Sequence, residues 1–153
     1  MTKPFSLQPL VHLAQQKNDD AARKFGQLNQ QQQAVQTKLD TLLQYRKDYQ
    51  TRFQEAVQNG MNQSDLRNFQ AFIQRLDEAI AQQRAANEHA CQSVQAGRGE
   101  LQKAQRKMKS FDTLAQRHSE GEKKLETKSE QRQQDEHTGR SATIKATAAQ
   151  HED

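Results

Sequence analysis

The sequence of 153 residues has little of what an ordinary globular core requires. Hydrophobic residues make up 32% of the chain and aromatic residues 5%, and tryptophan is absent. A composition this polar cannot fill the several layers of a globular domain, although it can fill one narrow apolar seam between helices. The shortage therefore leaves two structural classes to distinguish, a coiled coil and a disordered chain.

Cysteine and long apolar runs are scarce as well. Cys91 stands alone, which excludes an internal disulfide and fits a reducing compartment. No segment approaches the roughly 18 apolar residues that a membrane-spanning helix needs, and polar residues interrupt the N-terminal segment where a signal peptide would lie. These features predict a soluble cytoplasmic protein without a membrane span.

An excess of charge of one sign is also missing, because 23 basic residues face 19 acidic ones. This mixture is typical of a solvated helical surface rather than of a protein that binds nucleic acid. One denser basic cluster is either such a solvated face or a docking site for an acidic partner. Its members are Lys103, Arg106, Lys107 and Lys109.

Motifs that carry chemistry are absent from the sequence. It has no glycine-rich phosphate loop, no HExxH motif and no pair of metal-ligand cysteines. His118 and Glu122 share a helical face, but an isolated pair at this spacing is usually a surface feature. We therefore expect no enzyme activity, no cofactor, no metal site and no nucleic-acid partner.

What the sequence does contain is a seven-residue apolar repeat. Every seventh residue from Leu7 to Ala56 is apolar, and a second repeat extends from Leu66 to about Ala115. A strict repeat of seven predicts a left-handed coiled coil. Polar residues inside the repeat cost stability and can fix register and partner number; these residues are Asn18, Gln32, Arg46, Gln83 and Asn87.

The two repeats are separated by a break at residues 58–64. Gly60 suits a helix C-cap, where glycine takes the left-handed backbone conformation at no cost. We expect Ser6 to cap the first helix and Ser64 to cap the second, with Asp65 favourably placed against the helix dipole. The short connection favours an antiparallel hairpin, and hence a monomer, over a parallel homodimer.

The predicted fold is all-α, a long antiparallel two-helix coiled-coil hairpin with a disordered C-terminal tail. The hairpin covers residues 1–136, with a first helix over about 6–57, a turn over 58–64 and a second helix over about 65–132. The tail covers 137–153. Gly97 and Gly99 fall within the second helix and mark a tolerated soft spot, a close approach between helices or a functional hinge.

Apolar residues that the repeat does not need are candidates for function. Phe72 precedes the repeat position Ile73, so it lies beside the seam, and Phe72, Leu76 and Ala79 follow the i, i+4, i+7 spacing of a helical stripe. Phe72 either covers the nearby turn as a hydrophobic plug or contacts a partner. A polar residue, Gln83, follows on the same stripe.

Several motifs resemble those of one protein family, the flagellar FliJ family, with its YscO-like relatives in injectisomes. The match is closest in the run after the turn, from Asn68-Phe69-Gln70-Ala71-Phe72-Ile73 to Ala79-Ile80. Further matching segments are the opening Phe5-x-Leu7-x-x-Leu10-x-x-Leu13, Leu42-x-x-Tyr45-Arg46-x-x-Tyr49, Leu114-x-x-Arg117, Glu130-Gln131 and Asp135-Glu136.

The resemblance implies a function in the type III protein export apparatus that builds the flagellum for motility and chemotaxis. It implies a non-enzymatic stalk, similar to the central stalk of rotary ATP synthases, that links a FliI-like export ATPase ring and its FliH-like regulator to the cytoplasmic domain of a FlhA-like export gate. Export chaperones would be further partners. The protein would be cytoplasmic and peripheral at the inner face of the cell membrane.

The resemblance also implies which residues meet these partners. Phe72, Leu76 and Ala79 match the gate-contact positions at the turn end of the hairpin. The open end, with both termini, would sit in the ATPase ring, with contacts from Leu7, Leu10, Leu13, Arg117 and Leu125. The alternatives are an equivalent stalk protein of a virulence injectisome, a generic homodimeric coiled-coil adaptor and a basic coiled coil that binds nucleic acid.

Overall fold

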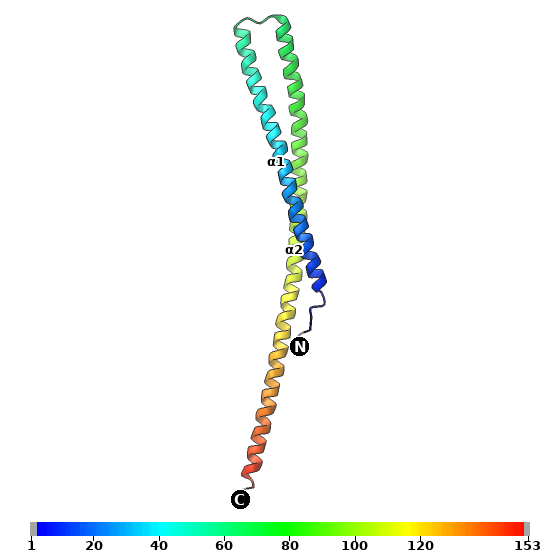
Figure 1. Cartoon of the computed structure of the whole chain (residues 1–153), viewed down its shortest axis with the longest axis vertical. Helices are drawn as coiled ribbons and strands as arrows, with labels where there is room; N and C mark the ends of the chain where they lie inside the picture. Colours follow the sequence, from blue (N-terminus) through cyan, green and yellow to red (C-terminus); the bar gives the residue numbers. More distant parts are fainter. Residues whose placement is uncertain (1–2, 152–153) are drawn as a thin grey trace. The chain divides into compact units, whose positions relative to one another are not determined.

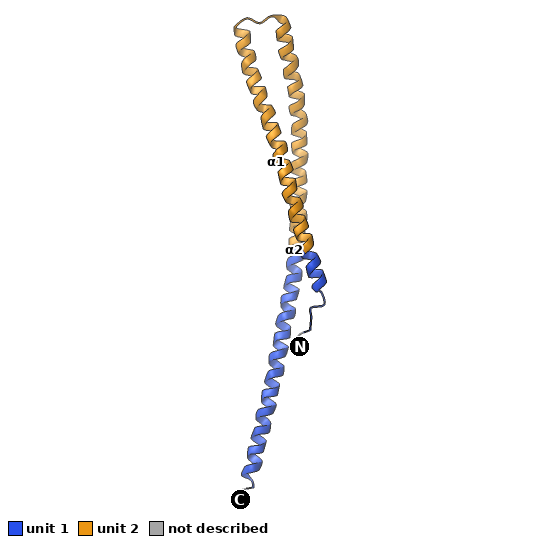
Figure 2. Ribbon diagram, viewed as in Figure 1, with its two compact units in different colours: residues 1–15, 106–153 blue, residues 16–105 orange. Residues whose placement is uncertain are grey.

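The computed structural model describes residues 3–151, most of which lie in two α-helices (Figure 1). Helix α1 spans Gln8–Gln58 and helix α2 spans Gln63–Ala149. The chain divides into two compact units (Figure 2), unit 1 with residues 1–15 and 106–153 and unit 2 with residues 16–105. No residue of 3–151 lies in a strand, so the prediction of an all-α fold is confirmed.

In unit 2, α1 and α2 run antiparallel from the turn that joins them. The ring of Phe53 meets that of Phe69, with centroids 5.6 Å apart, and farther from the turn Gln32 reaches Asn87. The prediction of a hairpin is therefore confirmed for this unit. In unit 1, Phe5 from the N-terminal segment contacts His118 of α2, with ring centroids 5.3 Å apart.

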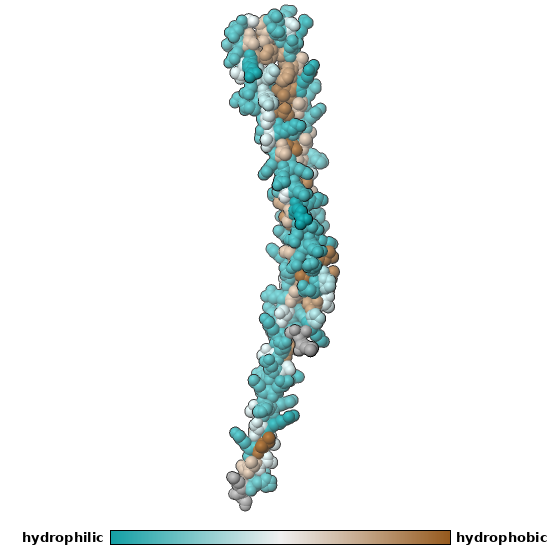
Figure 3. All heavy atoms as spheres, in the orientation of Figure 1, coloured by the Kyte–Doolittle hydropathy of each residue, from teal (hydrophilic) through white to brown (hydrophobic). Residues whose placement is uncertain are grey.

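The seven-residue repeat forms the seam between the helices. Every position of the two predicted repeats, from Leu7 to Ala56 and from Leu66 to Ala115, is buried or half-buried, and so is Glu122, one heptad farther. The buried hydrophobic residues are Val11, Ala14, Leu39, Leu76, Ile80 and Val94. The face in Figure 3 is otherwise mostly hydrophilic, as expected of a chain whose apolar residues fill only one seam.

Polar residues in and beside the seam form hydrogen bonds across the helices of unit 2. Gln32 Nε2 donates to Asn87 Oδ1 at 3.3 Å, and Asn87 Nδ2 donates to Gln36 Oε1 at 2.8 Å. Gln83 Nε2 donates to the backbone carbonyl of Val35 at 3.0 Å. Because these groups keep hydrogen-bond partners, the penalty for removing them from water is largely offset.

The turn between α1 and α2 comprises residues 59–62. Gly60 has a φ of +86°, and its N–H donates to the Val57 carbonyl at 3.2 Å. This confirms the predicted glycine C-cap. The predicted Ser64 cap is wrong, because α2 begins earlier, at Gln63, and Asn62 Oδ1 accepts the Asp65 N–H at 2.8 Å. Asparagine caps helices as well as serine does.

The start of α1 also differs from the prediction. The first helical hydrogen bond runs from the Val11 N–H to the Leu7 carbonyl at 3.0 Å, and α1 begins at Gln8. Leu7 rather than Ser6 therefore takes the N-cap position. Pro9 lies in the first turn, where its missing N–H removes no helical bond.

Helix α2 continues well past the predicted end at residue 132. It reaches Ala149, so the prediction of a disordered tail is wrong for residues 137–149, and residues 152–153 lie outside the described part of the chain. No proline interrupts this segment. Thr138, Thr143 and Thr147 each donate a side-chain hydrogen bond to the carbonyl four residues earlier. Side chains 123–140 are all exposed, so this segment is helical without packing against α1.

Candidate partner-binding surfaces

Aromatic residues gather in unit 2 near the turn. Tyr49 of α1 lies between Phe69 and Phe72 of α2, with ring centroids 5.9 Å and 4.2 Å away. The Phe72 ring stacks on Tyr49 at an interplanar angle of 24°. Aromatic pairs at these separations add about 0.5–1.5 kcal/mol beyond the area that they bury. The cluster therefore stabilises the hairpin as well as supplying an exposed surface.

Phe72 is partly packed and partly exposed, which is compatible with either interpretation of its sequence position. One face of its ring packs on Tyr49, and 39% of the residue remains exposed. The stacking holds the ring beside the seam instead of inside it. A rigid aromatic side chain that is already ordered loses little conformational entropy when a partner covers it.

The other two residues of the predicted stripe are less accessible. Leu76 is only 7% exposed and packs with Leu39 and Ile80 in the core of unit 2. Ala79 is half-buried. A partner on this surface would therefore meet Phe72 first, while Leu76 holds the helix that presents it.

Tyr45 extends this surface and was not among the predicted contact residues. It lies one turn before Tyr49 on the same face of α1, and 57% of it is exposed. The sequence held a signal for it, since Tyr45 directly precedes the repeat position Arg46 as Phe72 precedes Ile73. We call Tyr45, Tyr49 and Phe72 the aromatic surface.

A charged pair joins α1 and α2 close to the aromatic surface. Arg46 Nε and Nη2 donate to the Asp77 carboxylate, the second bond measuring 3.5 Å. The hydrogen bond from Arg46 lowers the pKa of Asp77 below its usual value of 3.8, and the same bond raises the pKa of Arg46. Both groups thus keep their charges at neutral pH, which explains how arginine occupies a repeat position.

The predicted ATPase-ring residues all belong to unit 1. Leu7 is half-buried, and Leu10 and Leu13 are each 44% exposed. Arg117 and Leu125 are exposed. Leu114 was missed, although it is 42% exposed and directly precedes the repeat position Ala115. Leu10, Leu13 and Leu114 are therefore the exposed leucines of the paired part of unit 1, and Leu125 lies where α2 is unpaired.

His118 and Glu122, the pair considered for a metal, lie in unit 1 with 3.8 Å between Nε2 and Oε1. The second contact of His118 is the Phe5 ring described above. Within residues 3–151, no three His, Cys, Asp or Glu side chains gather at one point. His118 thus contacts both Glu122 and the Phe5 ring within unit 1.

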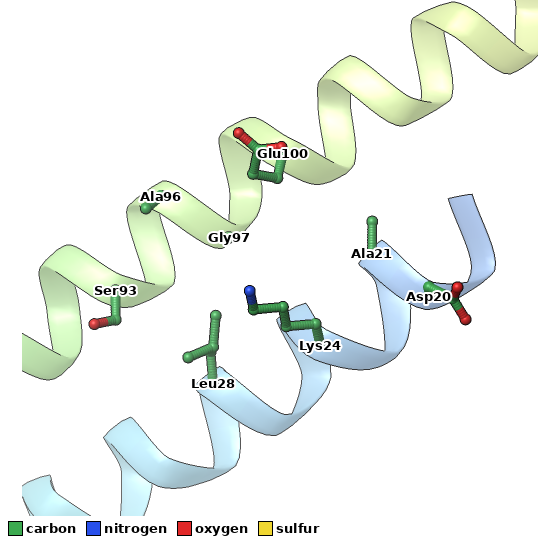
Figure 4. Close-up of a pocket in the computed structure, with 8 residues that line it drawn as sticks. All are labelled: Asp20, Ala21, Lys24, Leu28, Ser93, Ala96, Gly97 and Glu100. Atoms are coloured by element: carbon green, nitrogen blue, oxygen red, sulfur yellow. The ribbon is translucent and has the colours of Figure 1, made fainter. Parts of the chain in front are cut away.

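Gly97 marks a close approach between the helices of unit 2. It is buried, and a Cβ atom there would lie 2.7 Å from Leu28 Cδ1, whereas a Cβ at Gly99 would meet nothing within 4 Å. This supports the close-approach interpretation for Gly97. An open hollow of about 450 Å³ adjoins it (Figure 4), lined by Asp20, Ala21, Lys24, Leu28, Ser93, Ala96, Gly97 and Glu100.

Neither helix, within the described residues, is apolar enough over 18 residues to cross a membrane. This agrees with the polar composition, because the apolar residues of both helices are spaced along one seam instead of forming a continuous run.

Known proteins similar to the chain come from the flagellar system. The flagellar FliJ protein family matches residues 2–146. The flagellar FliJ protein of Salmonella typhi is 28% identical over 145 residues, which cover 95% of this chain and 99% of that protein. The flagellar FliJ protein of Escherichia coli strain K12 is 27% identical over 145 residues, with the same coverage. Both candidate surfaces lie within the matched region.

Proposed function

Because the chain belongs to the flagellar FliJ protein family, we propose that it acts in flagellar protein export as a non-enzymatic adaptor. One observation carries this proposal: each unit of a mostly hydrophilic molecule exposes its own set of large apolar residues. Two separate surfaces of this kind suit a protein that engages two partners. The partners proposed are the export ATPase (FliI-like, with its FliH-like regulator) and the cytoplasmic domain of the export gate (FlhA-like).

The aromatic surface of unit 2 is the proposed contact with the gate domain. Tyr45 and Phe72 remain exposed although the seam does not need them, and Tyr49 braces Phe72 from the opposite helix. Exposed, preorganised aromatic residues are the commonest anchors of protein interfaces. Leu76 and Ala79, on the same stripe of α2 as Phe72, are the further gate contacts expected.

Substitution of Phe72 tests the gate contact. Phe72→Ala should weaken binding to the purified gate domain at least about tenfold, the cost typical of a truncated aromatic anchor. Binding would be measured by titration calorimetry, with thermal unfolding of the same sample as the test of folding. Leu114→Ala, in unit 1, is the matched control and should bind the gate domain as the wild type does. Unchanged gate binding by a folded Phe72→Ala protein would leave Phe72 as a plug of the hairpin.

The exposed leucines of unit 1 are the proposed contact with the ATPase. Leu10 and Leu13 are three residues apart on α1 and so share a helical face, with Leu7, Arg117 and Leu125 as the further contacts expected. Leu10→Ala with Leu13→Ala should weaken capture of the protein by immobilised ATPase and leave gate binding unchanged. Equal capture of variant and wild type would argue against this placement.

The adaptor is proposed to work as a monomer. Gln32, Gln36 and Asn87 of unit 2 find hydrogen-bond partners within one chain, whereas the buried Asn18 Oδ1 has none among the described residues. A parallel dimer would have to replace these pairs. Light scattering at micromolar concentration should give a mass near 17.6 kDa, and a stable dimer would contradict the proposal.

Export chaperones are proposed as further partners, and the protein is placed in the cytoplasm, peripheral at the inner face of the membrane. The family match favours the flagellar system over an injectisome. Deletion of the gene should abolish swimming and flagellar export if this is correct. A deletion strain that swims normally but fails in injectisome secretion would favour the alternative.

A further inference from the structure

Charge is distributed unevenly in unit 1. Residues 3–15 and 106–118 carry five Lys or Arg side chains and a single carboxylate, Asp112. Residues 119–136, by contrast, carry four cations and six carboxylates. The five cations are all exposed, and none forms an ion pair with any residue of 3–151. They are Lys3, Arg106, Lys107, Lys109 and Arg117.

The fold gains nothing from concentrating these charges. Arg106 and Lys109 are three residues apart on α2, a spacing at which like charges repel each other and destabilise a helix. The seam needs neither of them, because its positions in this segment are Ala104, Met108 and Phe111. Exposed cations without ion pairs among residues 3–151, two of them at a repulsive spacing, point to a role in binding.

Exposed leucines accompany the cations. Leu114 lies on α2 between Lys107, two turns earlier on its face, and Arg117, one turn later. Leu10 and Leu13 are exposed on α1 of the same unit. An apolar centre with a polar rim is the usual composition of a protein–protein interface.

We propose that the basic face, formed by Arg106, Lys109 and Arg117 with Lys107 on its flank beside Leu114, docks on an acidic surface of the export ATPase, with the exposed leucines adding apolar contact. This inference rests on the proposed function, which places unit 1 against the ATPase. Opposite charges across the interface would relieve the repulsion between the cations, speed association and restrict the orientation of docking.

An anionic membrane would offer the same negative charge, but the apolar component favours a protein. Interfacial helices bury a continuous apolar face with large side chains such as Trp, Phe and Leu. Leu10, Leu13 and Leu114 are partly covered at 42–44% exposure, and they are divided between two helices, two on α1 and one on α2. Three such side chains match the small apolar centre of a protein contact.

The test compares two triple variants of the full chain that change net charge equally. Arg106→Gln, Lys107→Gln and Lys109→Gln remove most of the basic face. The control replaces three exposed cations of α1 in unit 2, Lys38, Lys47 and Arg52, with glutamine. Affinity for the purified export ATPase is measured by fluorescence anisotropy at several salt concentrations, and circular dichroism of each variant tests folding.

Wild-type affinity should fall as salt rises. The basic-face variant should bind about tenfold more weakly at low salt, with a flatter salt dependence, while the control matches the wild type. Equal affinity and equal salt dependence of the folded basic-face variant would overturn the inference. The inference would also be overturned if both triple variants bound the ATPase equally weakly, because the loss of net charge would then be the cause.

Binding of the ATPase as such and binding through the basic face are distinguished by different outcomes. If the Leu10→Ala, Leu13→Ala protein loses ATPase binding while the basic-face variant keeps it, the leucines contact the ATPase but the basic face does not. That result would overturn the inference of an acidic docking surface. If the wild type binds no ATPase at any salt concentration, the proposed function itself fails. Wild-type binding to phosphatidylglycerol vesicles, lost in the basic-face variant, together with no ATPase binding would identify a membrane as the occupant and overturn the inference.

Discussion

Gly97→Ala and Gly99→Ala should have clearly different effects on stability, although the two glycines are two residues apart in α2. In an exposed helix interior, alanine is more favourable than glycine by about 0.8–1.0 kcal/mol, because glycine loses more backbone freedom on folding. A Cβ at Gly99 meets nothing within 4 Å. Gly99→Ala should therefore raise the free energy of unfolding by about 1 kcal/mol.

The new methyl group at Gly97 meets the opposite helix. Its Cβ would lie 2.7 Å from Leu28 Cδ1 and 3.6 Å from Phe25 Cδ2. Extra methyl groups in a packed seam typically cost about 1–3 kcal/mol. Set against the same helix-propensity gain of about 1 kcal/mol, this leaves Gly97→Ala neutral or destabilising by up to about 2 kcal/mol. The two alanine variants should thus differ by about 1–3 kcal/mol.

Leu28→Ala identifies the cause of the difference. Without the Leu28 side chain the obstacle is gone, so Gly97→Ala should become stabilising by about 1 kcal/mol in that background. Urea unfolding followed by circular dichroism on the four proteins of this double-mutant cycle gives the coupling energy. A Gly97→Ala protein as stable as Gly99→Ala, or a coupling energy near zero, would refute the close approach.

Three further predictions concern the turn and the polar seam. Gly60→Ala should destabilise the hairpin by about 1 kcal/mol in urea unfolding, because φ is +86° there; an unchanged midpoint would contradict the capping argument. Asp77→Asn should make the free energy of unfolding less dependent on pH. The hydrogen bond from Arg46 lowers the folded-state pKa of Asp77 below 3.8, so this bond stabilises the hairpin above pH 3.8 and the stabilisation is lost as pH falls through the folded-state pKa. Urea unfolding midpoints of the wild type and of Asp77→Asn, at neutral pH and near pH 3, measure this effect. An equal pH dependence of the two midpoints would contradict a stabilising Arg46–Asp77 bond. Replacing Gln32 and Asn87 together by leucine should raise stability but relax the choice of partner helix; light scattering should then detect dimers, and a strictly monomeric variant would show that these polar residues do not set the association state.

The seam was predictable from the sequence because it depends only on local spacing. Each residue of a two-helix coiled coil meets a single neighbouring helix, so a repeat of seven fixes which side chains are buried. The repeat positions through Glu122 are covered for this reason, even where the residue is polar. The axial alignment of the two helices could not be predicted in the same way, because the repeat alone permits shifts of one helix by a whole heptad.

The features that the sequence could not resolve depend on alignment or on competing local signals. The stacking of Phe72 on Tyr49 requires one particular turn of α1 to face one particular turn of α2. Asn62 and Ser64 are both good caps, and two residues of sequence context do not choose between them. The C-terminal extension of α2 is not predictable from composition, because a polar segment is typical of disorder, whereas a segment with few helix breakers can remain helical while mostly exposed.

In a two-helix coiled coil, a residue beside a repeat position can contribute to packing and remain accessible to a partner. A seam between only two helices leaves its flanks open, so a large apolar residue next to a repeat position packs on one side and faces solvent on the other. Phe72 does this against Tyr49, and Leu10 and Leu114 directly precede the repeat positions Val11 and Ala115. A substitution at such a position should change partner binding more than stability, whereas Leu76, buried in the seam, should show the reverse. The ratio of the two effects, measured on the same variants, therefore separates binding residues from structural ones within a single helix.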